Sequence, residues 1–360
     1  MKSKKIYGFV LLALIIMLLP IGMVSAKYKQ TKDVGTVILD IAPPVLSPKW
    51  KTKLTTATTT LIVDSFTPET DSDRYSSFSW ESGTPVGYDS SNKNGFKSNV
   101  RLFEDNGTAY ILAIGNNPVT FPENSSSLFH DDQWYLSNVE KINFKNINTS
   151  NVVDMSNMFI YCAKLKRLDA SGFNTSNVED MSNMFFNCAS LTSLDLSNFN
   201  TSGVTDMKYM FNTCERLTSL NINSFDTSNV TNMENMFGSC ASLPSLDLSN
   251  FSISNETNMH NFFTFCSQLK QVTLGGNFKF INYSADTTVL LPGQNFSGAN
   301  GKWYISNSGQ GYNSTDVAVY HNEHKTTTTY YAVQSEAPSS TNTFSLLTEN
   351  GTINGAIQGN

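Results

Sequence analysis

Charged side chains are scarce in this sequence, and the short motifs that commonly carry enzymatic chemistry are missing. Only 15% of the 360 residues are charged, and the formal net charge is -6. There is no Gly-x-Ser-x-Gly, no phosphate-binding loop and no His-Glu-x-x-His. An acidic chain without a stripe of Lys and Arg argues against nucleic acid, because phosphate binding depends on clustered cations. The sequence therefore predicts no enzyme and no nucleic-acid-binding protein.

Cysteine pairs at Cys-x-x-Cys spacing are also missing, and the chain contains only five cysteines. An odd number cannot pair fully in disulfides, and no second Cys or His lies at the spacing of a metal site. Free cysteine is among the most buried residue types. We expect unbonded, buried thiols, with no metal and no cofactor. The cysteines follow one another at intervals of 26 residues: Cys162, Cys188, Cys214, Cys240 and Cys266.

Other residue types keep the same interval, which identifies a tandem repeat. Five methionines, five phenylalanines and five leucines recur with the cysteines, and no insertion separates the units. Such self-similarity predicts an array in which each unit packs only against its neighbours. These columns are Met155, Met181, Met207, Met233 and Met259; Phe159, Phe185, Phe211, Phe237 and Phe263; and Leu165, Leu191, Leu217, Leu243 and Leu269.

Each unit has two parts with different hydrophobic spacing. In "NVEDMSNMFFNC" the apolar residues follow Val178 at offsets of three, six, seven and ten, which predicts a short helix. In "LTSLDLSNF", Leu194 and Leu196 alternate with polar residues, as in a half-buried strand. Together with Leu191 they match the strand signature of leucine-rich repeats. The sequence predicts an α/β solenoid, a leucine-rich-repeat array of parallel strands and short helices flanked by β-rich capping segments.

The repeated unit resembles that of the BspA-like leucine-rich-repeat surface proteins of bacteria. Thr-Ser-Asn-Val, Met-x-x-Met-Phe and Phe-x-x-Cys-x-x-Leu occur together repeatedly over residues 142–278. The following "LGGNFKF", "GKW" and "TTYYAVQ" also fit the segment that closes the last repeat in that family. The resemblance implies an extracellular, surface-associated interaction protein, often an adhesin. The implied partner is an extracellular protein or glycoprotein, such as one of the host matrix, and we expect a monomer.

The flanks of the array differ from it in composition. A basic head, a long apolar run and Val-Ser-Ala predict a signal peptide, or alternatively an uncleaved membrane anchor, so we expect a secreted or cell-surface protein. Asn106-Gly107 between two apolar runs predicts a β-hairpin. We expect a signal peptide or anchor in 1–26, a Thr/Ser/Pro-rich spacer in 27–98, an N-terminal β-rich cap in 99–141, the repeats in 142–278, a C-terminal β-rich cap in 279–334 and a polar tail in 335–360.

The outward polar positions of the strands, on the concave side of the predicted sheet, fit a partner-binding surface and a merely solvated sheet equally well. The variable positions on the helix side, where aromatics interrupt the repeat, are an alternative surface or a seal between units: Ile160-Tyr161, Phe186, Tyr209 and Phe265. A structural or envelope-associated protein without a dedicated ligand is the alternative function. The candidate binding residues are Asp169, Asp195, Asn221 and Asp247, with Arg167, Ser193, Ser219 and Ser245 beside them.

Histidine and aspartate pairs give little sign of catalysis. His321 and His324 could share a metal on a helix, but the surrounding "VAVYHNEHKTTTTYY" has strand and turn composition, which predicts a solvated loop. Asp131-Asp132 beside His130 is expected in an ordinary surface loop.

Overall fold

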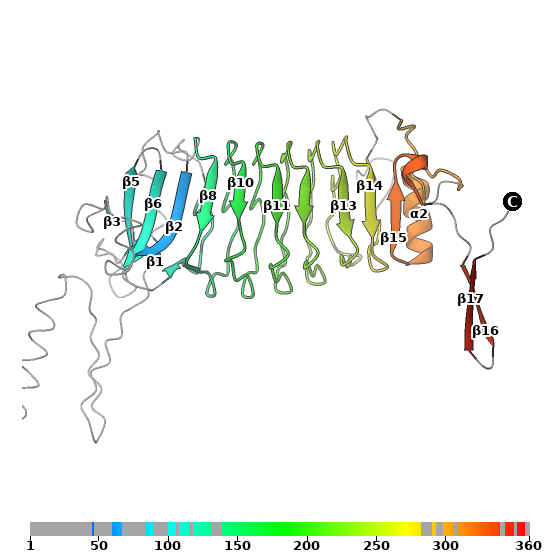
Figure 1. The fold of residues 1–360 in the computed structure, drawn as a ribbon, viewed down its shortest axis with the longest axis horizontal. Helices are drawn as coiled ribbons and strands as arrows, with labels where there is room; N and C mark the ends of the chain where they lie inside the picture. Colours follow the sequence, from blue (N-terminus) through cyan, green and yellow to red (C-terminus); the bar gives the residue numbers. More distant parts are fainter. Residues whose placement is uncertain are drawn as a thin grey trace, which may run out of the picture.

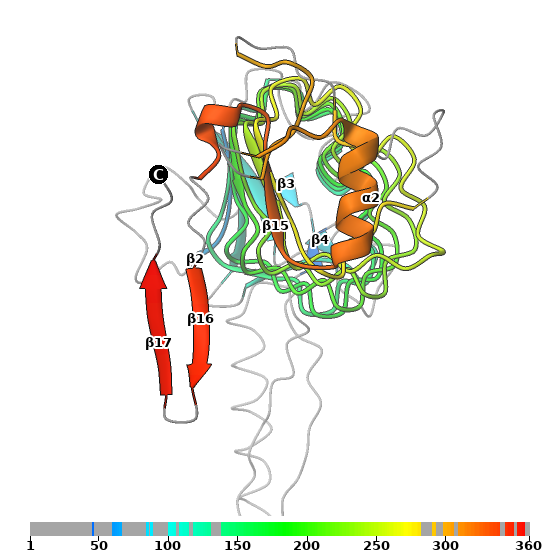
Figure 2. The ribbon, with the colours of Figure 1, turned by 90° about the vertical axis from the view of Figure 1, so that its right-hand side faces the viewer.

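The structure, a computed structural model, is a solenoid of short parallel strands that lie side by side along its long axis (Figure 1). Viewed along that axis, the successive units superpose closely (Figure 2). The predicted signal peptide, residues 1–26, lies outside the described residues. These are 45–46, 60–66, 84–85, 87–88, 100–105, 108–114, 118–130, 138–281, 290–292, 298–305, 309–338, 343–348 and 351–356.

One strand from each unit joins the ladder in register. Ser193 pairs with Ser219 and Ser245 pairs with Gln271, always in parallel and one repeat apart, so the predicted parallel strands are confirmed. Leu168 pairs with Ile142 of the strand before the array, which extends the register backwards. The strands are β8 (Lys141–Phe144), β10 (Arg167–Asp169), β11 (Ser193–Asp195), β12 (Ser219–Asn221), β13 (Ser245–Leu248) and β14 (Gln271–Leu274).

A second ladder runs along the opposite side of each unit. Single parallel bridges link one residue per unit, which shows that this side also stacks in register. We call the surface over 154–162, 180–188, 206–214, 232–240 and 258–266 the turn face, and the outward side chains of β8 and β10–β14 the strand face. The bridged residues are Asn124, Asp154, Asp180, Asp206, Asn232 and Asn258.

The segment predicted as a helix in each unit is a run of tight turns, so this part of the prediction was wrong. Asn183 and Asn187 have φ angles of 54° and 57°, in the left-handed region that a right-handed helix excludes. Met184 and Phe186 donate their N–H groups to carbonyls three residues earlier, whereas Phe185 donates to the next unit. A helix cannot form because alternate N–H groups bond between units. The apolar offsets of a helix fit this run of turns equally well.

The core between the two ladders is a set of stacked columns. Ring centroids of Phe159 and Phe185 are 5.5 Å apart, those of Phe185 and Phe211 5.8 Å, and those of Phe211 and Phe237 5.6 Å, with nearly parallel rings. The methionine and cysteine columns are buried beside them. Burying each such side chain contributes roughly 1.5–3 kcal/mol, and the contact exists only because neighbouring units stack.

A buried threonine column bonds the units to one another at the chain reversals. The Oγ1 of Thr201 donates to the carbonyl of Asp226 at 2.8 Å and accepts the Asp226 N–H at 2.8 Å. Each threonine thus satisfies two backbone groups of the following unit, which a buried chain reversal requires. The same pair of bonds recurs at Thr149, Thr175, Thr201 and Thr227.

The N-terminal cap extends the solenoid sheet. The predicted hairpin at Asn106-Gly107 is confirmed by the antiparallel pairing of its two strands. Strand β2 comes from the predicted spacer, 27–98, yet it lies between β6 and β8 with Leu61 and Val63 buried. Part of this range is therefore core rather than spacer. The strands are β2 (Thr60–Phe66), β3 (Thr84–Pro85), β5 (Val100–Asp105) and β6 (Thr108–Ile114), in the order β10-β8-β2-β6-β5-β3.

A smaller sheet accompanies this cap. It contains two strands from the predicted spacer, one from the cap and one from the start of the repeats. Its strands are β1 (Val45–Leu46), β4 (Gly87–Tyr88), β7 (Val119–Thr120) and β9 (Ile147–Asn148), in the order β4-β1-β7-β9.

The C-terminal cap contains a helix as well as a strand. Strand β15 (Thr328–Tyr331) pairs antiparallel with β14, and helix α2 (Ser314–His324) lies across the end of the solenoid (Figure 2). The side chain of Asn313 caps the helix by accepting the Asp316 N–H. Among the described residues, no helix has the length and apolarity needed to cross a membrane.

The predicted polar tail, 335–360, also contains regular structure. After a short 3-10 turn, Gln334–Glu336, an antiparallel hairpin forms between β16 (Thr343–Thr348) and β17 (Gly351–Ala356). The tail is therefore not entirely irregular.

Candidate binding faces

The structure places the predicted binding residues in two straight columns on the strand face. Arg167, Ser193, Ser219 and Ser245 begin strands β10–β13, and the acidic or amide column lies two residues later. All eight side chains are exposed except that of Asn221, which is half-buried. Parallel pairing of β11 with β12 holds Ser193 beside Ser219 and Asp195 beside Asn221 at the spacing of adjacent strands, about 4.8 Å.

The acidic column also has a local structural role. The Oδ1 of Asp195 accepts the N–H of Ser197 at 3.0 Å, and Asp247 accepts that of Ser249 at 2.9 Å. These bonds close a turn at the end of each strand. The hydroxyl and N–H of Ser171 lower the pKa of Asp169, so this carboxylate remains charged at neutral pH. The same residues therefore terminate strands and give the strand face a weak negative charge.

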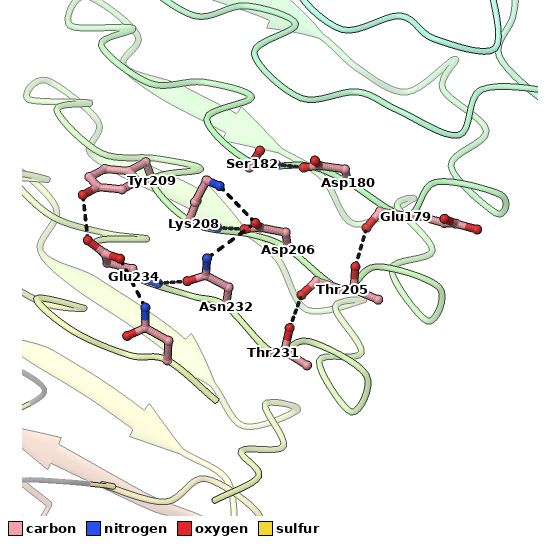
Figure 3. A network of polar contacts seen from close by, with 11 residues as sticks. Glu179, Asp180, Ser182, Thr205, Asp206, Lys208, Tyr209, Thr231, Asn232 and Glu234 are labelled. Atoms are coloured by element: carbon pink, nitrogen blue, oxygen red, sulfur yellow. Dashed lines mark hydrogen bonds and ion pairs between the residues drawn. The ribbon is translucent and has the colours of Figure 1, made fainter. Parts of the chain in front are cut away.

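The turn face carries a polar network that links four units (Figure 3). Asp206 accepts the backbone N–H of Lys208 at 2.8 Å, and its other oxygen lies 3.3 Å from the Lys208 ammonium. In the next unit Asn232 repeats the turn by accepting the Glu234 N–H at 3.2 Å. Tyr209 donates its hydroxyl to Glu234 at 2.8 Å, and this bond raises the pKa of Tyr209.

Aromatic side chains form a continuous row on the turn face. The Tyr161 and Phe186 ring centroids are 5.5 Å apart, and those of Phe186 and Tyr209 are 6.1 Å apart, both in edge-to-face geometry. His130 lies 5.8 Å from Tyr161 at the start of the row. We call Tyr161, Phe186 and Tyr209 the aromatic row. Tyr161 is exposed, whereas Phe186 and Tyr209 are half-buried. Phe265, which is 75% exposed, belongs to the fifth unit and is not part of the row.

These aromatics were predicted as an alternative surface, but the repeat spacing does not predict that they lie together. Tyr161, Phe186 and Tyr209 occupy three different positions of the repeat, so the 26-residue spacing does not bring them into one column. Their contact follows from the left-handed turns, which redirect the side chains. A signal was present in the sequence: Asn recurs at the position of Asn183 in four of the five units, and Asn tolerates the left-handed conformation better than most residues.

The cysteine column is buried and forms no disulfide, as predicted. Each Sγ donates to the backbone carbonyl of a phenylalanine in the preceding unit. Burial raises the pKa of Cys214 and of Cys266 to about 12, so these thiols stay protonated. They are hydrogen-bond donors of the core, and their protonated state removes them as nucleophiles.

The two close histidines lie on helix α2 rather than in the predicted loop. His321 is buried and bonds through its two ring nitrogens to the Tyr330 hydroxyl and the Gly275 carbonyl, and burial lowers its pKa. His324 is exposed and stacks on Tyr320. The ring nitrogens of His321 bond to Tyr330 and Gly275, whereas Nδ1 of His324 bonds to the Tyr320 carbonyl, so the two rings do not face one common site. No group of three metal-ligating side chains gathers among the described residues, which exclude Asp131-Asp132.

Comparison with known sequences and structures agrees with a repeated architecture. No curated protein and no solved structure matches the chain. One family model matches three times in overlapping copies, at residues 123–220, 167–278 and 190–303. Because these matches together cover half of the 360 residues, the chain belongs to the family described as Mycoplasma protein of unknown function, DUF285.

Proposed function

We propose that this chain is an exported binding protein of the BspA-like leucine-rich-repeat type, which presents its solenoid to an extracellular protein or glycoprotein. The observation that carries the proposal is the strand face, where exposed polar side chains repeat in register over consecutive strands. Such a surface allows many weak contacts to add up along an extended partner. The stacked core beneath it keeps the columns straight without a ligand.

Binding to a macromolecule is favoured over catalysis by the chemistry of the two faces. The strand-face carboxylates close turns, and the buried thiols are held protonated. These arrangements stabilise the fold and supply neither a nucleophile nor a base beside it. An adhesin or another surface receptor needs only a rigid, hydrated platform, which both faces provide.

The experiment is a binding screen with the purified chain lacking its first 26 residues. Immobilised host matrix glycoproteins and whole host cells would be tested with the wild type and with a strand-face variant, Asp195→Asn with Asp247→Asn. Asn can still close the strand-end turns, as Asn221 does. We expect binding by the wild type and a severalfold loss in the variant. Consistent absence of binding to both surfaces would reject adhesion.

A structural protein of the cell envelope is the second candidate. The absence of aromatic side chains from the outward positions of β10–β13 favours it, because binding hot spots are enriched in Trp, Tyr and Arg. Cell fractionation with N-terminal sequencing separates the two functions. Recovery in the medium with a mature start at Lys27 would count against envelope retention.

A further inference from the structure

We propose that the aromatic row and the carboxylates beside it form a docking surface for an arginine-bearing segment of a partner protein. This inference rests on the proposed function, because it assigns a second contact surface to the same binding protein. The row consists of Tyr161, Phe186 and Tyr209, from three consecutive units.

Stacking of the units does not require these rings. In the fourth unit the equivalent positions are Asn235, Gly238 and Ser239, yet this unit bonds to the fifth in the same pattern as the others. Asn187 and Asn212 show that Asn fits two of the three positions inside the array. The aromatic side chains are therefore additions to a surface that folds without them.

Two of the rings are held in an unfavourable backbone conformation. Tyr161 has a φ of 62° and Tyr209 a φ of 56°, in the left-handed region where bulky residues are rare. The second unit has Asn at both positions, as Asn187 and Asn183, and the left-handed φ recurs at these positions in the other units. Tyr161 is also 45% exposed, so burial of its ring does not explain its presence. Strain of this kind concentrates at functional surfaces, where another requirement outweighs stability.

Carboxylates share the turn face with the row. Asp154, Asp180 and Asp206 form consecutive members of the second ladder, and Glu234 accepts the Tyr209 hydroxyl. Figure 3 shows Tyr209, Glu234, Asp206 and Asp180 on one side of the solenoid. Lys208 lies among them and pairs with Asp206. The surface thus combines ring faces and edges with an excess of carboxylates.

A guanidinium group fits this combination better than other protein side chains. Its plane stacks on aromatic rings, and its N–H groups bond to carboxylates in a bidentate manner. A cation is also attracted to the face of an aromatic ring. A run of arginines along the row would meet a ring on each of three units, and at Tyr209 it would also meet the Glu234 carboxylate. Charge complementarity therefore selects a basic partner segment over an apolar one.

The test uses substitutions that keep both the charge and the repeat pattern. The triple variant Tyr161→Asn, Phe186→Asn and Tyr209→Asn installs residues found at the same positions of other units. Phe265→Asn is the matched control, because Phe265 is exposed in the same column as Tyr161 but lies outside the row. The probe is a fluorescent decapeptide of alternating arginine and serine, with a second peptide in which uncharged citrulline replaces arginine. Binding is measured by anisotropy at physiological salt.

We expect the arginine peptide to bind the wild type and Phe265→Asn equally, and to bind the triple variant at least tenfold more weakly. The citrulline peptide should bind none of them. Equal binding to the triple variant would show that the acidic surface acts without the rings and would overturn the proposal. Equal binding of the two peptides would indicate a neutral or apolar ligand and overturn it as well. Circular dichroism must show a folded triple variant; if it does not fold, the single variant Tyr161→Asn replaces it with the same criterion.

The outcome is separable from that of the proposed function. Loss of host-surface binding in the strand-face variant, together with no arginine-peptide binding by the wild type, would leave the proposed function standing and remove this docking surface. Peptide binding through the row without any host-surface binding would keep this docking surface and reject adhesion.

Discussion

The thiol of Cys214 lies 3.3 Å from the backbone carbonyl oxygen of Phe185 in the preceding unit. The same carbonyl also accepts the N–H of Cys188 within its own unit. One buried oxygen thus receives a donor from each of two neighbouring units. This explains the regular spacing of the cysteines: each supplies a small apolar side chain that still carries one hydrogen for a carbonyl of the unit before it.

Replacing Cys214 with Ala should destabilise the solenoid by about 1–3 kcal/mol, because the carbonyl of Phe185 loses a donor and a small cavity forms. Urea unfolding measures the difference. Cys214→Ser is the matched control, since its hydroxyl keeps a hydrogen near the carbonyl, and we expect it to retain part of the lost stability. An alanine variant as stable as the serine variant would show that the sulfur only fills space.

All five thiols should be unreactive in the native protein. They are buried, and Ellman's reagent needs an accessible thiolate. We expect no colour under native conditions and five equivalents after denaturation. Rapid labelling without denaturant, or a mass spectrum showing disulfides among these residues, would contradict the buried column.

Stability should fall as the pH rises above about 9. The unfolded thiol has a pKa of 9.0, whereas burial raises that of Cys214 and Cys266 to about 12 in the folded state. Between these values the unfolded chain releases protons that the folded chain retains, so alkali favours unfolding by about 1.4 kcal/mol per pH unit for each thiol. Urea midpoints at pH 7.5, 9 and 10 test this. The Cys214→Ala variant should show a shallower slope, and an identical slope would refute the assignment.

Thr201→Val should cost about 2–4 kcal/mol, although the two side chains have the same shape. The substitution removes both bonds of Oγ1 and leaves the N–H and carbonyl of Asp226 without them at a buried reversal. Thr201→Ser keeps the hydroxyl and should lose less than half as much. Denaturant titration of the three proteins gives the comparison; equal losses for Val and Ser would mean that the methyl group matters rather than the hydroxyl.

The variant Tyr161→Gly should have a free energy of unfolding about 1 kcal/mol higher than that of Tyr161→Ala. The φ of 62° is unstrained only for glycine, and alanine retains the penalty of a Cβ atom in the left-handed region. This order is the opposite of that at an ordinary helical site. Thermal unfolding of Tyr161→Gly and Tyr161→Ala measures it. If alanine were the more stable of the two, the strain described at this position would be disproved.

The repeat spacing predicted the register of the array because residues that stack on one another recur at the same interval in the sequence. Leu194 and Leu220 are one repeat apart and are paired neighbours in the structure. The turn face was mispredicted because apolar offsets alone do not distinguish a helix from turns whose N–H groups bond to the next unit. The Asn residues at left-handed positions carried that information.

Other differences between the prediction and the structure arise from tertiary contacts. Strand β2 could not be placed because its partners β6 and β8 lie far along the chain. The valines and tyrosine of α2 favour a strand locally, but burial of Val317, Ala318 and His321 and the cap at Asn313 make it a helix. The hairpin β16–β17 was not predicted, although Asn350-Gly351 is the same dipeptide as Asn106-Gly107. Its strands pair from Thr348 and Gly351 onward, so the glycine lies in the strand rather than in the turn.

The positions of the strand-face residues followed from the alternation of Leu194 and Leu196, but their bonds did not. Nothing in the spacing shows that Asp195 accepts the Ser197 N–H. Likewise, Tyr161 and Tyr209 meet Phe186 only because of turn geometry that the spacing of the repeat does not contain.

Neighbouring units bond to each other through a repeated set of backbone atoms, and no residue intervenes between one unit and the next. Recombination within the gene can therefore add or delete whole repeats, and the new junction is identical to the old ones. Both caps would keep the partners that they have now. The length of the displayed surface can thus change in discrete steps over generations without any redesign of its ends.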